Sequence, residues 1–412
     1  MSAGKCRFCG SALKHTFCDL GQSPFSNAYL KPQDLLKREA FYPLHTYVCD
    51  TCFLVQLEQF ESPDKIFNDD YGYFSSYSDS WLNHAKQYVN DMCQNYGINS
   101  SQLVIEIASN DGYLLKYFKE KNIPVLGIEP AANVATAAQA IGIPSLIKFF
   151  GVQTAQELVN EGKQADLLLG NNVLAHVPDL NDFVKGMKIV LKPKGLITME
   201  FPHLLRLMEE NQFDTIYHEH FSYFSFLTVE KVFAKHGLTL FDVEELSTHG
   251  GSLRIYGKHA DDSSKPISKR VENLKKHELA YGLNKLDTYQ AFQHKVTKIK
   301  EKLLHFLQDV KKKGKSVVAY GAPAKGNTLL NYCKVSTELL EYTVDRSLHK
   351  QGRYLPGTHI PIKEPELISR TKPDYLLILP WNLKNEIMQQ MACIREWNGK
   401  FVIPIPELEI IN

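Results

Sequence analysis

Short apolar runs alternate with helix-like stretches through the middle of the chain, and this alternation restricts the fold more than any other feature. The runs lie at residues 103–108, 125–129, 165–170 and 195–201, with Gly-containing turns or helical patterns between them. Buried strands that alternate with helices form βαβ units, whose strands are parallel and covered on both faces. The same rhythm returns at residues 316–320, 339–345, 374–381 and 401–406. The sequence therefore predicts two α/β units.

A long helical pattern joins the two α/β units, and a cysteine-containing segment precedes the first. The helical pattern extends from about residue 267 to residue 313, and Gly282 and Asn284 are placed to divide it. Residues 1–70 are rich in proline, aromatic and polar residues and show no long helical period. A chain of 412 residues has room for about three domains of ordinary size. We expect them at 1–70, at 71–260, which contains the first α/β unit, and at 261–412, which contains the helices and the second unit.

The composition predicts an ordinary globular protein without a membrane segment. Hydrophobic residues are 44% and charged residues 23% of the chain. There is no run of about 18 apolar residues, and the first residues, MSAGKCRFCG, lack the apolar core of a signal peptide. We therefore expect a cytoplasmic protein with reduced cysteines and no membrane partner. We expect a monomer, although the sequence leaves an oligomer open.

The charge distribution does not favour a nucleic-acid partner. The formal net charge is +1, far from the excess that a surface built for nucleic acid carries. Basic residues do outnumber acidic ones between Lys265 and Lys315. The residues interleaved with them form an aliphatic stripe and not an aromatic stacking platform, so we interpret this stretch as a solvated linker helix.

Four cysteines near the N-terminus form two C-x-x-C pairs, Cys6 with Cys9 and Cys49 with Cys52. Two intervening residues let the chain turn back, so each pair can bind one edge of a tetrahedral Zn²⁺ ion. Four thiolates would close the site, so the sequence predicts structural and not catalytic zinc. His15 and Cys18 are rival ligands. Incidental reduced pairs or a redox dithiol remain alternatives.

The turn after the apolar run at 103–108 is the expected cofactor site, because Rossmann-like sheets bind nucleotide cofactors there. The G-x-G-x-x-G pattern of dinucleotide sites is absent. An acidic residue at the strand end repels phosphate but suits a cationic or amine-bearing ligand. A second carboxylate, after the next strand, can accept both ribose hydroxyls. An amide that follows residues 165–170 would face the methionine end of the cofactor. Together these residues favour S-adenosylmethionine over NAD; they are Glu106, Ala108, Asn110, Gly112, Glu129, Asn171 and Asn172.

The densest polar cluster in an aromatic setting is YHEHFSYF at residues 217–224. It offers a base, a carboxylate to orient or charge that base, and phenols to hydrogen-bond an oxyanion. The two histidines of His218-Glu219-His220 form an alternative metal pair, but no third ligand is nearby in the sequence. A packing role for the histidines is the other alternative.

Two glycine-containing turns are candidate anion sites. In STHGGSLR, His249, Gly250 and Gly251 let backbone N–H groups approach an anion, and Arg254 can pair with it. A plain β-hairpin is the alternative. In GAPAKGNT, Lys325 and Asn327 add donors at the start of a helix that can receive a pyrophosphate. This second turn is not a Walker A motif, so ATP hydrolysis is not expected.

The order and spacing of several motifs resemble a known family over nearly the whole chain. The motifs are the two C-x-x-C pairs, EIASNDGYLL, GIEP, NNVLAHVPD, EFPH, YHEHFSYFS, STHGGSLR and AYGAPAKGN. The sequence resembles the S-adenosylmethionine (SAM)-dependent nucleotide-sugar C-3′-methyltransferases of deoxysugar pathways. This resemblance implies a Rossmann-like SAM methyltransferase domain, a small N-terminal zinc-binding domain and a second, C-terminal Rossmann-like α/β domain.

The resemblance also implies roles for particular residues. His220 would be the base that removes the sugar C-3 proton, with Tyr217 and Glu219 beside it. His176 would lie at the end of the SAM-binding sheet, and Tyr71 would come from the segment after the zinc domain. Tyr73 and Tyr77 are close enough in sequence to take the place of Tyr71. The C-terminal unit would help to hold the nucleotide diphosphate of the substrate.

The expected function is therefore SAM-dependent methylation at C-3 of a nucleotide-linked 4-keto-6-deoxy sugar, with TDP as the expected nucleotide. A base-generated enolate would be the carbon nucleophile. One alternative is a SAM-dependent O- or N-methyltransferase that acts on another small molecule, but transfer to a hydroxyl needs no enolate stabiliser. A zinc-containing nucleic-acid-binding regulator is an alternative of a different class, and strong retention on heparin would support it.

Overall fold

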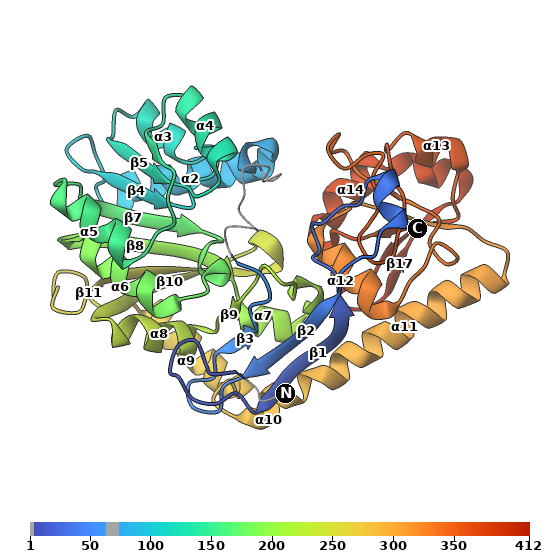
Figure 1. The fold of residues 1–412 in the computed structure, drawn as a ribbon, viewed down its shortest axis with the longest axis horizontal. Coiled ribbons are helices and arrows are strands. Elements are labelled where there is room, and N and C mark those ends of the chain that lie inside the picture. The colour runs from blue at the N-terminus through green and yellow to red at the C-terminus, as the bar shows by residue number, and fades with distance from the viewer. Residues whose placement is uncertain (1–3, 63–73) are drawn as a thin grey trace.

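The computed structural model describes residues 4–62 and 74–412, and their strands form three sheets (Figure 1). The first sheet is antiparallel, with strand order β1-β2-β3-β9. Its strands are β1 (His15–Ser23), β2 (Tyr42–Val48), β3 (Val55–Leu57) and β9 (Ser222–Tyr223). Strand β9 comes from far along the chain and pairs with β3, so this sheet is completed by the segment that follows His220.

The second sheet has seven strands in the order β10-β11-β8-β7-β4-β5-β6. The run from β8 to β6 is parallel, and β11 and β10 add an antiparallel edge. Its strands are β4 (Val104–Ile107), β5 (Val125–Ile128), β6 (Ser145–Leu146), β7 (Ala165–Asn171), β8 (Leu191–Pro202), β10 (Leu238–Leu246) and β11 (Ser252–His259). Its helices are α2 (Asp79–Asn95), α3 (Leu115–Glu120), α4 (Ala132–Ala140), α5 (Val152–Asn160), α6 (Leu180–Val190), α7 (Leu204–Glu209) and α8 (Phe226–Lys235).

The third sheet has the order β14-β13-β12-β15-β16-β17 and is parallel except for β17. Its strands are β12 (Val317–Tyr320), β13 (Thr343–Val344), β14 (Ile362–Lys363), β15 (Tyr375–Ile378), β16 (Lys400–Ile403) and β17 (Glu409–Ile411). The helices that accompany it are α12 (Ala324–Cys333), α13 (Leu367–Thr371) and α14 (Lys384–Gln390).

The helical pattern at 267–313 forms three helices, α9 (Lys269–Tyr281), α10 (Leu286–Gln290) and α11 (Phe292–Lys312). Helix α9 ends at Gly282, whose φ of +97° is a left-handed conformation that glycine adopts without steric cost. Helix α11 then runs along one side of the molecule and connects the middle sheet to the C-terminal one (Figure 1). Its apolar stripe packs into a core that is shared by the first and third sheets.

The fold is thus a Rossmann-like α/β domain, with an N-terminal cysteine cluster and a second α/β domain at the C-terminus. The boundaries at 70/71 and 260/261 stay predictions, and the first lies outside the described residues. In the middle sheet, β7 and β5 flank β4, so the chain reverses its winding direction beside β4. Ligands of open α/β sheets bind at such a switch point, outside the carboxyl ends of the strands. No helix of the described residues is long and apolar enough to cross a membrane.

Candidate active site and zinc centre

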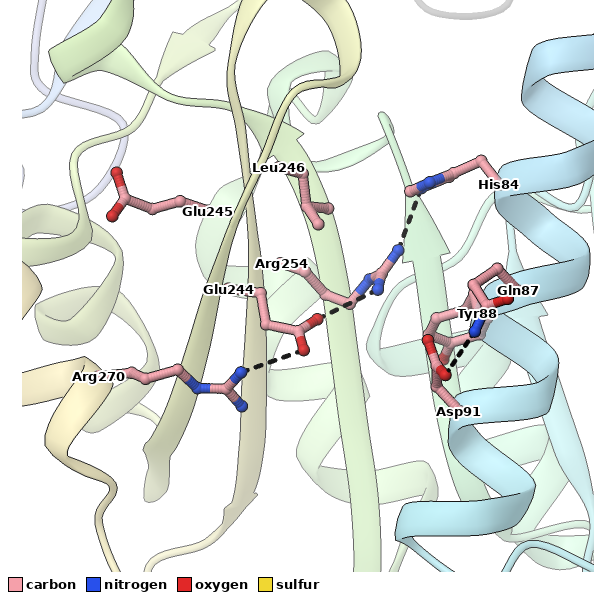
Figure 2. A pocket seen from close by; sticks show the side chains of 9 residues that line it. All are labelled: His84, Gln87, Tyr88, Asp91, Glu244, Glu245, Leu246, Arg254 and Arg270. Atoms are coloured by element: carbon pink, nitrogen blue, oxygen red, sulfur yellow. Dashed lines mark hydrogen bonds and ion pairs between the residues drawn. The ribbon is translucent and has the colours of Figure 1, made fainter.

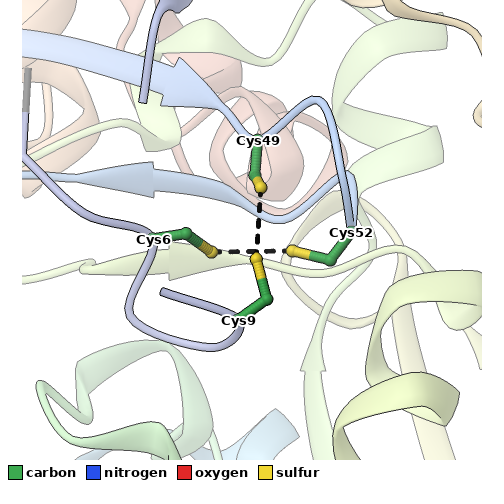
Figure 3. Close-up of side chains that lie close together, drawn as sticks. All are labelled: Cys6, Cys9, Cys49 and Cys52. Carbon is green, nitrogen blue, oxygen red and sulfur yellow. Dashed lines mark hydrogen bonds between the residues drawn. The ribbon is translucent and has the colours of Figure 1, made fainter. Parts of the chain in front are cut away.

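The four N-terminal cysteines form one compact cluster, with their Sγ atoms all within 4.8 Å of one another (Figure 3). Sγ of Cys6 lies 3.5 Å from Sγ of Cys52, and Sγ of Cys9 lies 3.5 Å from Sγ of Cys49. Each of these short distances joins a cysteine of one C-x-x-C pair to a cysteine of the other, so the two pairs form a single four-thiol site. Four converging thiols, three of them buried, fit a structural Zn²⁺ ion with no open position.

Two matching turns bring the cysteines together. Gly10 donates its N–H to the Cys6 carbonyl, and Phe53 donates to the Cys49 carbonyl, both at 2.9 Å. Both donor residues have left-handed backbones, with φ of +80° at Gly10 and +64° at Phe53. The rival ligands lie elsewhere: Cys18 is buried in β1, and the His15 imidazole pairs with Asp50 at 3.4 Å.

The cofactor turn follows β4 with three residues in the left-handed region, Ala108 (φ +55°), Asn110 (φ +50°) and Gly112 (φ +77°). A Cβ atom at Gly112 would lie 3.0 Å from a side-chain carbon of Ile143, so this position needs glycine for space as well as for conformation. The turn is fixed by Glu129, which follows β5. Its two carboxylate oxygens accept hydrogen bonds from the N–H groups of Asn110 (3.0 Å) and Ala131 (2.9 Å).

Several buried polar atoms beside this turn have no hydrogen-bond partner among the residues that the structure describes. They are both carboxylate oxygens of Glu106, Oγ of Ser109, Oδ1 of Asp111 and Oδ1 of Asn172. Burial raises the pKa of Glu106 well above its ordinary value, against the lowering effect of the Tyr113 hydroxyl. Unpaired buried polar groups cost free energy unless a ligand satisfies them. Oxygen acceptors of this kind suit the ammonium and hydroxyl groups of SAM.

The two amides predicted at the methionine end lie where β7 ends. Asn171 donates from Nδ2 to the Tyr113 hydroxyl at 3.2 Å. Nδ2 of Asn172 lies 3.0 Å from Nε2 of His249, which joins the cofactor edge to the hairpin at residues 247–254. Trp81 of α2 stacks on Tyr113 (6.0 Å between ring centroids) and meets His249 edge-on (5.3 Å).

His220 is held by hydrogen bonds at both ring nitrogens. Its Nδ1 lies 2.9 Å from the Thr215 carbonyl, which only accepts, so Nδ1 carries the proton. Nε2 is therefore the acceptor, and the Tyr217 hydroxyl lies 2.8 Å from it. Burial lowers the pKa of His220 well below its ordinary value, and the nearby His176 lowers it further. The imidazole is thus neutral at pH 7, with its basic nitrogen toward Tyr217.

Two of the other predicted catalytic side chains, His176 and Tyr217, contact His220, and Glu219 contacts His176. The imidazole of His176 lies with its centroid 4.7 Å from that of His220, and its Nδ1 is 2.7 Å from the Glu219 carbonyl. Burial lowers the pKa of His176 to about 4. The Glu219 carboxylate accepts a hydrogen bond from Asn27 of the N-terminal domain at 2.8 Å. The structure therefore brings the side chains of His176, Tyr217 and His220 together, and Glu219 joins them through its backbone carbonyl.

His218 and Tyr77 are not part of this group of contacts around His220. His218 is buried among Phe25, Tyr42 and Phe60, and its Nε2 lies 3.2 Å from the Pro43 carbonyl. It therefore packs against the N-terminal domain, and the cysteine cluster is the one metal-ligand group found among the described residues. Tyr71 and Tyr73 lie outside the described residues. Tyr77 is 73% exposed and stacks on Phe74, away from His220.

The hairpin at 247–254 contacts the C-terminal domain through its glycines. His249 (φ +55°), Gly250 (φ +90°) and Gly251 (φ +120°) are all left-handed. A Cβ atom at Gly250 would lie 2.5 Å from the indole ring of Trp381. The Lys325 ammonium donates to the His249 carbonyl at 3.2 Å and lies 4.6 Å from the Trp381 ring centroid. Lys325 therefore reaches the hairpin from the start of α12.

Arg254 and Asn327 already have protein partners. The Arg254 guanidinium is 4% exposed and pairs with Glu200 at 2.8 Å and with Glu244 at 3.2 Å. Arg254 and Glu244 are part of a charged row, with His84 and Arg270, that runs along a surface pocket of about 430 Å³ between α2 and β10 (Figure 2). Asn327 is fully buried and donates to the Ser26 carbonyl at 2.5 Å. A substrate-binding role for either residue stays a prediction.

Three residues near the site were not anticipated from the sequence. Asn27 contacts Glu219, and Glu200 links His84 to Arg254 through its carboxylate. Asp214 accepts a hydrogen bond from the Trp381 indole at 2.7 Å, and burial raises its pKa to about 6. Glu200 lies in the EFPH motif, one of the motifs that carry the family resemblance, so the sequence did offer a reason to consider it. Asn27 and Asp214 belong to no pattern that indicates chemistry.

Three family models match successive parts of the chain. The model described as "Putative zinc binding domain" matches residues 6–67, and the "Methyltransferase domain" model matches residues 82–243. The model described as "C-methyltransferase C-terminal domain" matches residues 247–406. The first of these agrees with the cysteine cluster and the second with the sheet that contains Glu106 and Glu129.

The C-methyltransferase NovU of Streptomyces niveus is 33% identical to this chain over 99% of the chain and 97% of its own length. This protein therefore belongs to the family of SAM-dependent C-methyltransferases with an N-terminal zinc-binding domain, which confirms the resemblance found in the sequence. A ubiquinone biosynthesis O-methyltransferase of Bartonella tribocorum is 30% identical, but over only 23% of this chain and 38% of that one.

Two solved structures each cover about half of this chain. PH0226 of Pyrococcus horikoshii is 16% identical and covers 48% of this chain and 99% of its own, with a TM-score of 0.38. Magnesium protoporphyrin IX methyltransferase of Synechocystis is 12% identical and covers 47% of this chain and 88% of its own, with a TM-score of 0.34. Similarity at this level supports no inference about a substrate.

Proposed function

We propose that this enzyme methylates C-3 of a nucleotide-linked 4-keto-6-deoxy sugar, with TDP as the expected nucleotide. A carbon beside a keto group loses its proton readily, because the resulting charge moves to the keto oxygen as an enolate. Such a reaction needs one neutral base and hydrogen-bond donors for the enolate oxygen. The observation that carries the proposal is the arrangement at His220: a neutral imidazole with Nε2 as acceptor and a phenol beside it.

In this proposal Nε2 of His220 takes the C-3 proton, while the Thr215 carbonyl stabilises the resulting imidazolium through Nδ1–H. The Tyr217 hydroxyl, which can turn away from Nε2 once that nitrogen carries the proton, is the candidate donor to the enolate oxygen. SAM supplies the methyl group as an electrophile, so the new C–C bond forms as the S–CH₃ bond breaks. Tyr71 stays in the proposal only through the family resemblance.

The C-terminal sheet supports the assignment of the nucleotide to that domain. Asp345 follows β13 and accepts hydrogen bonds from the N–H groups of Ala322 and Ser347, both at 2.8 Å. Glu129 accepts in the same way from the N–H groups of Asn110, in the turn after β4, and of Ala131. Each sheet thus carries an anchored carboxylate beside its first strand-to-helix turn. That position suits ribose hydroxyls.

The proposed substrate can be tested with labelled SAM and a panel of 4-keto nucleotide sugars. We expect label to enter the sugar at C-3 for the TDP compound. Incubation in deuterated buffer without SAM should exchange the C-3 hydrogen, since proton removal precedes methyl transfer. Exchange without methylation would separate the enolate step from transfer. Transfer to a hydroxyl or amine of another acceptor, with no C-3 exchange, would contradict the proposal.

We propose that Glu106 receives the ammonium group of SAM, and this assignment predicts a pH dependence of binding. Because burial raises the pKa of Glu106, the carboxyl is neutral in acid and ionises as the pH rises. SAM affinity should therefore increase as the pH rises and Glu106 ionises, as long as the α-amino group of SAM keeps its proton. Glu106→Gln should remove this dependence and weaken binding about 10- to 100-fold at a pH at which the wild-type carboxyl is ionised.

Isothermal titration calorimetry at a series of pH values measures both the pH dependence of SAM affinity and the weaker binding of Glu106→Gln. Glu120→Gln is a matched control, because Glu120 is an exposed carboxylate at the end of α3. The control should bind SAM with the wild-type pH profile. Equal SAM affinity of wild type and Glu106→Gln at every pH would remove Glu106 from the cofactor site.

A further inference from the structure

The N-terminal domain reaches the catalytic cluster through one side chain. Nδ2 of Asn27 donates to Oε1 of Glu219 at 2.8 Å, although the two residues are 192 positions apart. The carboxylate only accepts, so the amide must present its NH₂ group and not its oxygen. Burial raises the pKa of Glu219, and the hydrogen bond from Asn27 opposes that effect. The Tyr29 phenol lies near this carboxylate, and the His176 imidazole contacts the backbone carbonyl of the same residue.

The segment that carries Asn27 is fixed on the side of the C-terminal domain. The Asn327 amide donates to the Ser26 carbonyl, and the Tyr29 hydroxyl donates to the Ala322 carbonyl, both at 2.5 Å. Leu30 exchanges backbone hydrogen bonds with Tyr354 at 3.0 and 2.9 Å. Anchors on both sides of Asn27 therefore come from the domain that is proposed to hold the nucleotide.

The catalytic segment is fixed by the same helix. Thr328 of α12 donates to the Ile216 carbonyl at 2.9 Å, immediately before Tyr217. Helix α12 thus holds both the Asn27 segment and the Glu219 segment. A side chain placed between two anchored segments has little freedom, which is the condition for positioning a reacting group accurately.

We infer that Asn27 is a positioning residue of the active site: its amide fixes the side chain of Glu219, whose backbone carbonyl contacts His176 and which directly precedes His220, so the zinc-bearing domain completes the catalytic cluster. This inference rests on the proposed function for its effect on turnover. The effect of Asn27 on the titration of Glu219 is independent of any substrate. The two consequences can therefore be measured separately.

The direct test is the titration of Glu219 by ¹³C NMR in protein labelled at the glutamate carboxyl carbon. The spectrum of Glu219→Gln identifies the signal by its loss. Removing a hydrogen bond to a charged acceptor should raise the pKa of Glu219 by about one unit in Asn27→Ala. Asn27→Asp, of nearly equal size, should raise it further because two adjacent carboxylates cannot both ionise freely. Ala28→Ser, at an exposed neighbour, is the control and should leave the titration unchanged.

The kinetic test follows the acid limb of kcat/KM on the keto-sugar substrate. The limb should move to higher pH in Asn27→Ala and further in Asn27→Asp, with zinc content and SAM affinity unchanged. An unchanged Glu219 titration in both variants would overturn the inference, whatever the substrate. If the wild-type enzyme methylates no keto sugar, the proposed function fails, and the Glu219 titration still decides the role of Asn27.

Discussion

Replacing His220 with asparagine should lower kcat by about 10²- to 10⁴-fold, the range in which a general base contributes to catalysis. Asparagine keeps a hydrogen-bonding group near the Nδ1 position, so the contact with the Thr215 carbonyl can persist, but it has no basic nitrogen. SAM affinity should stay within a fewfold of wild type, because the cofactor turn is built on β4 and β5. Stopped assays with labelled SAM, together with calorimetric SAM binding, measure the two effects.

His218 offers a matched control two residues away. Its ring packs against Phe25 and Tyr42 and faces the Pro43 carbonyl, so His218→Asn should lower the melting temperature while keeping most of kcat. C-3 exchange in deuterated buffer should also be lost in His220→Asn and kept in His218→Asn. Full turnover by His220→Asn would mean that another group removes the proton.

Loss of the zinc ion should have the second large effect. Cys9→Ser removes one of the four thiolates, and we expect it to lose zinc and more than about 4 kcal/mol of unfolding free energy. The reason is that a zinc ion bound by all four cysteines would hold the two turns at Gly10 and Phe53 together. Turnover should fall as well, because Asn27 belongs to the same domain. Metal analysis, thermal unfolding and turnover measure these three quantities.

Cys93→Ser is the matched control, since Cys93 is a partly buried cysteine of α2 outside the cluster. It should keep about one zinc ion per chain. SAM binding should survive in Cys9→Ser to the extent that the middle sheet stays folded. A Cys9→Ser protein with wild-type zinc content and stability would show that the cluster is not a structural metal site.

The fold class was predictable because its signals are local. The apolar runs and the turns between them lie within a few residues of each other, and the βαβ rule then determines the sheet type. Strand β9 could not be predicted, since a two-residue strand has no period and its pairing with β3 is a contact between distant parts of the chain. The division of the helical pattern at Gly282 was visible, because glycine is the usual residue beyond the end of a helix.

The candidate site was predictable where chemistry is concentrated in short motifs. Glu106, Glu129 and His220 stand in such motifs, and each lies beside other residues of the site. Arg254 shows the limit of this approach: a guanidinium near two glycines suggested an anion ligand, whereas its contacts in the structure are with Glu200 and Glu244. The sequence contains no pattern that indicates the pairing of Arg254 with either carboxylate. Contacts of this kind depend on strand register, which a single sequence does not specify.

Strand β9 also determines how this protein can be divided. The segment after His220 pairs with β3, so the N-terminal sheet is discontinuous in the chain and combines β1, β2 and β3 with the short strand β9. A chimera that exchanges only the N-terminal residues with a relative would place a foreign β3 against the native β9. Successful exchange therefore needs both pieces from one parent. A substitution in β3 must also remain compatible with β9, and the reverse, so we expect these two strands to change together among relatives.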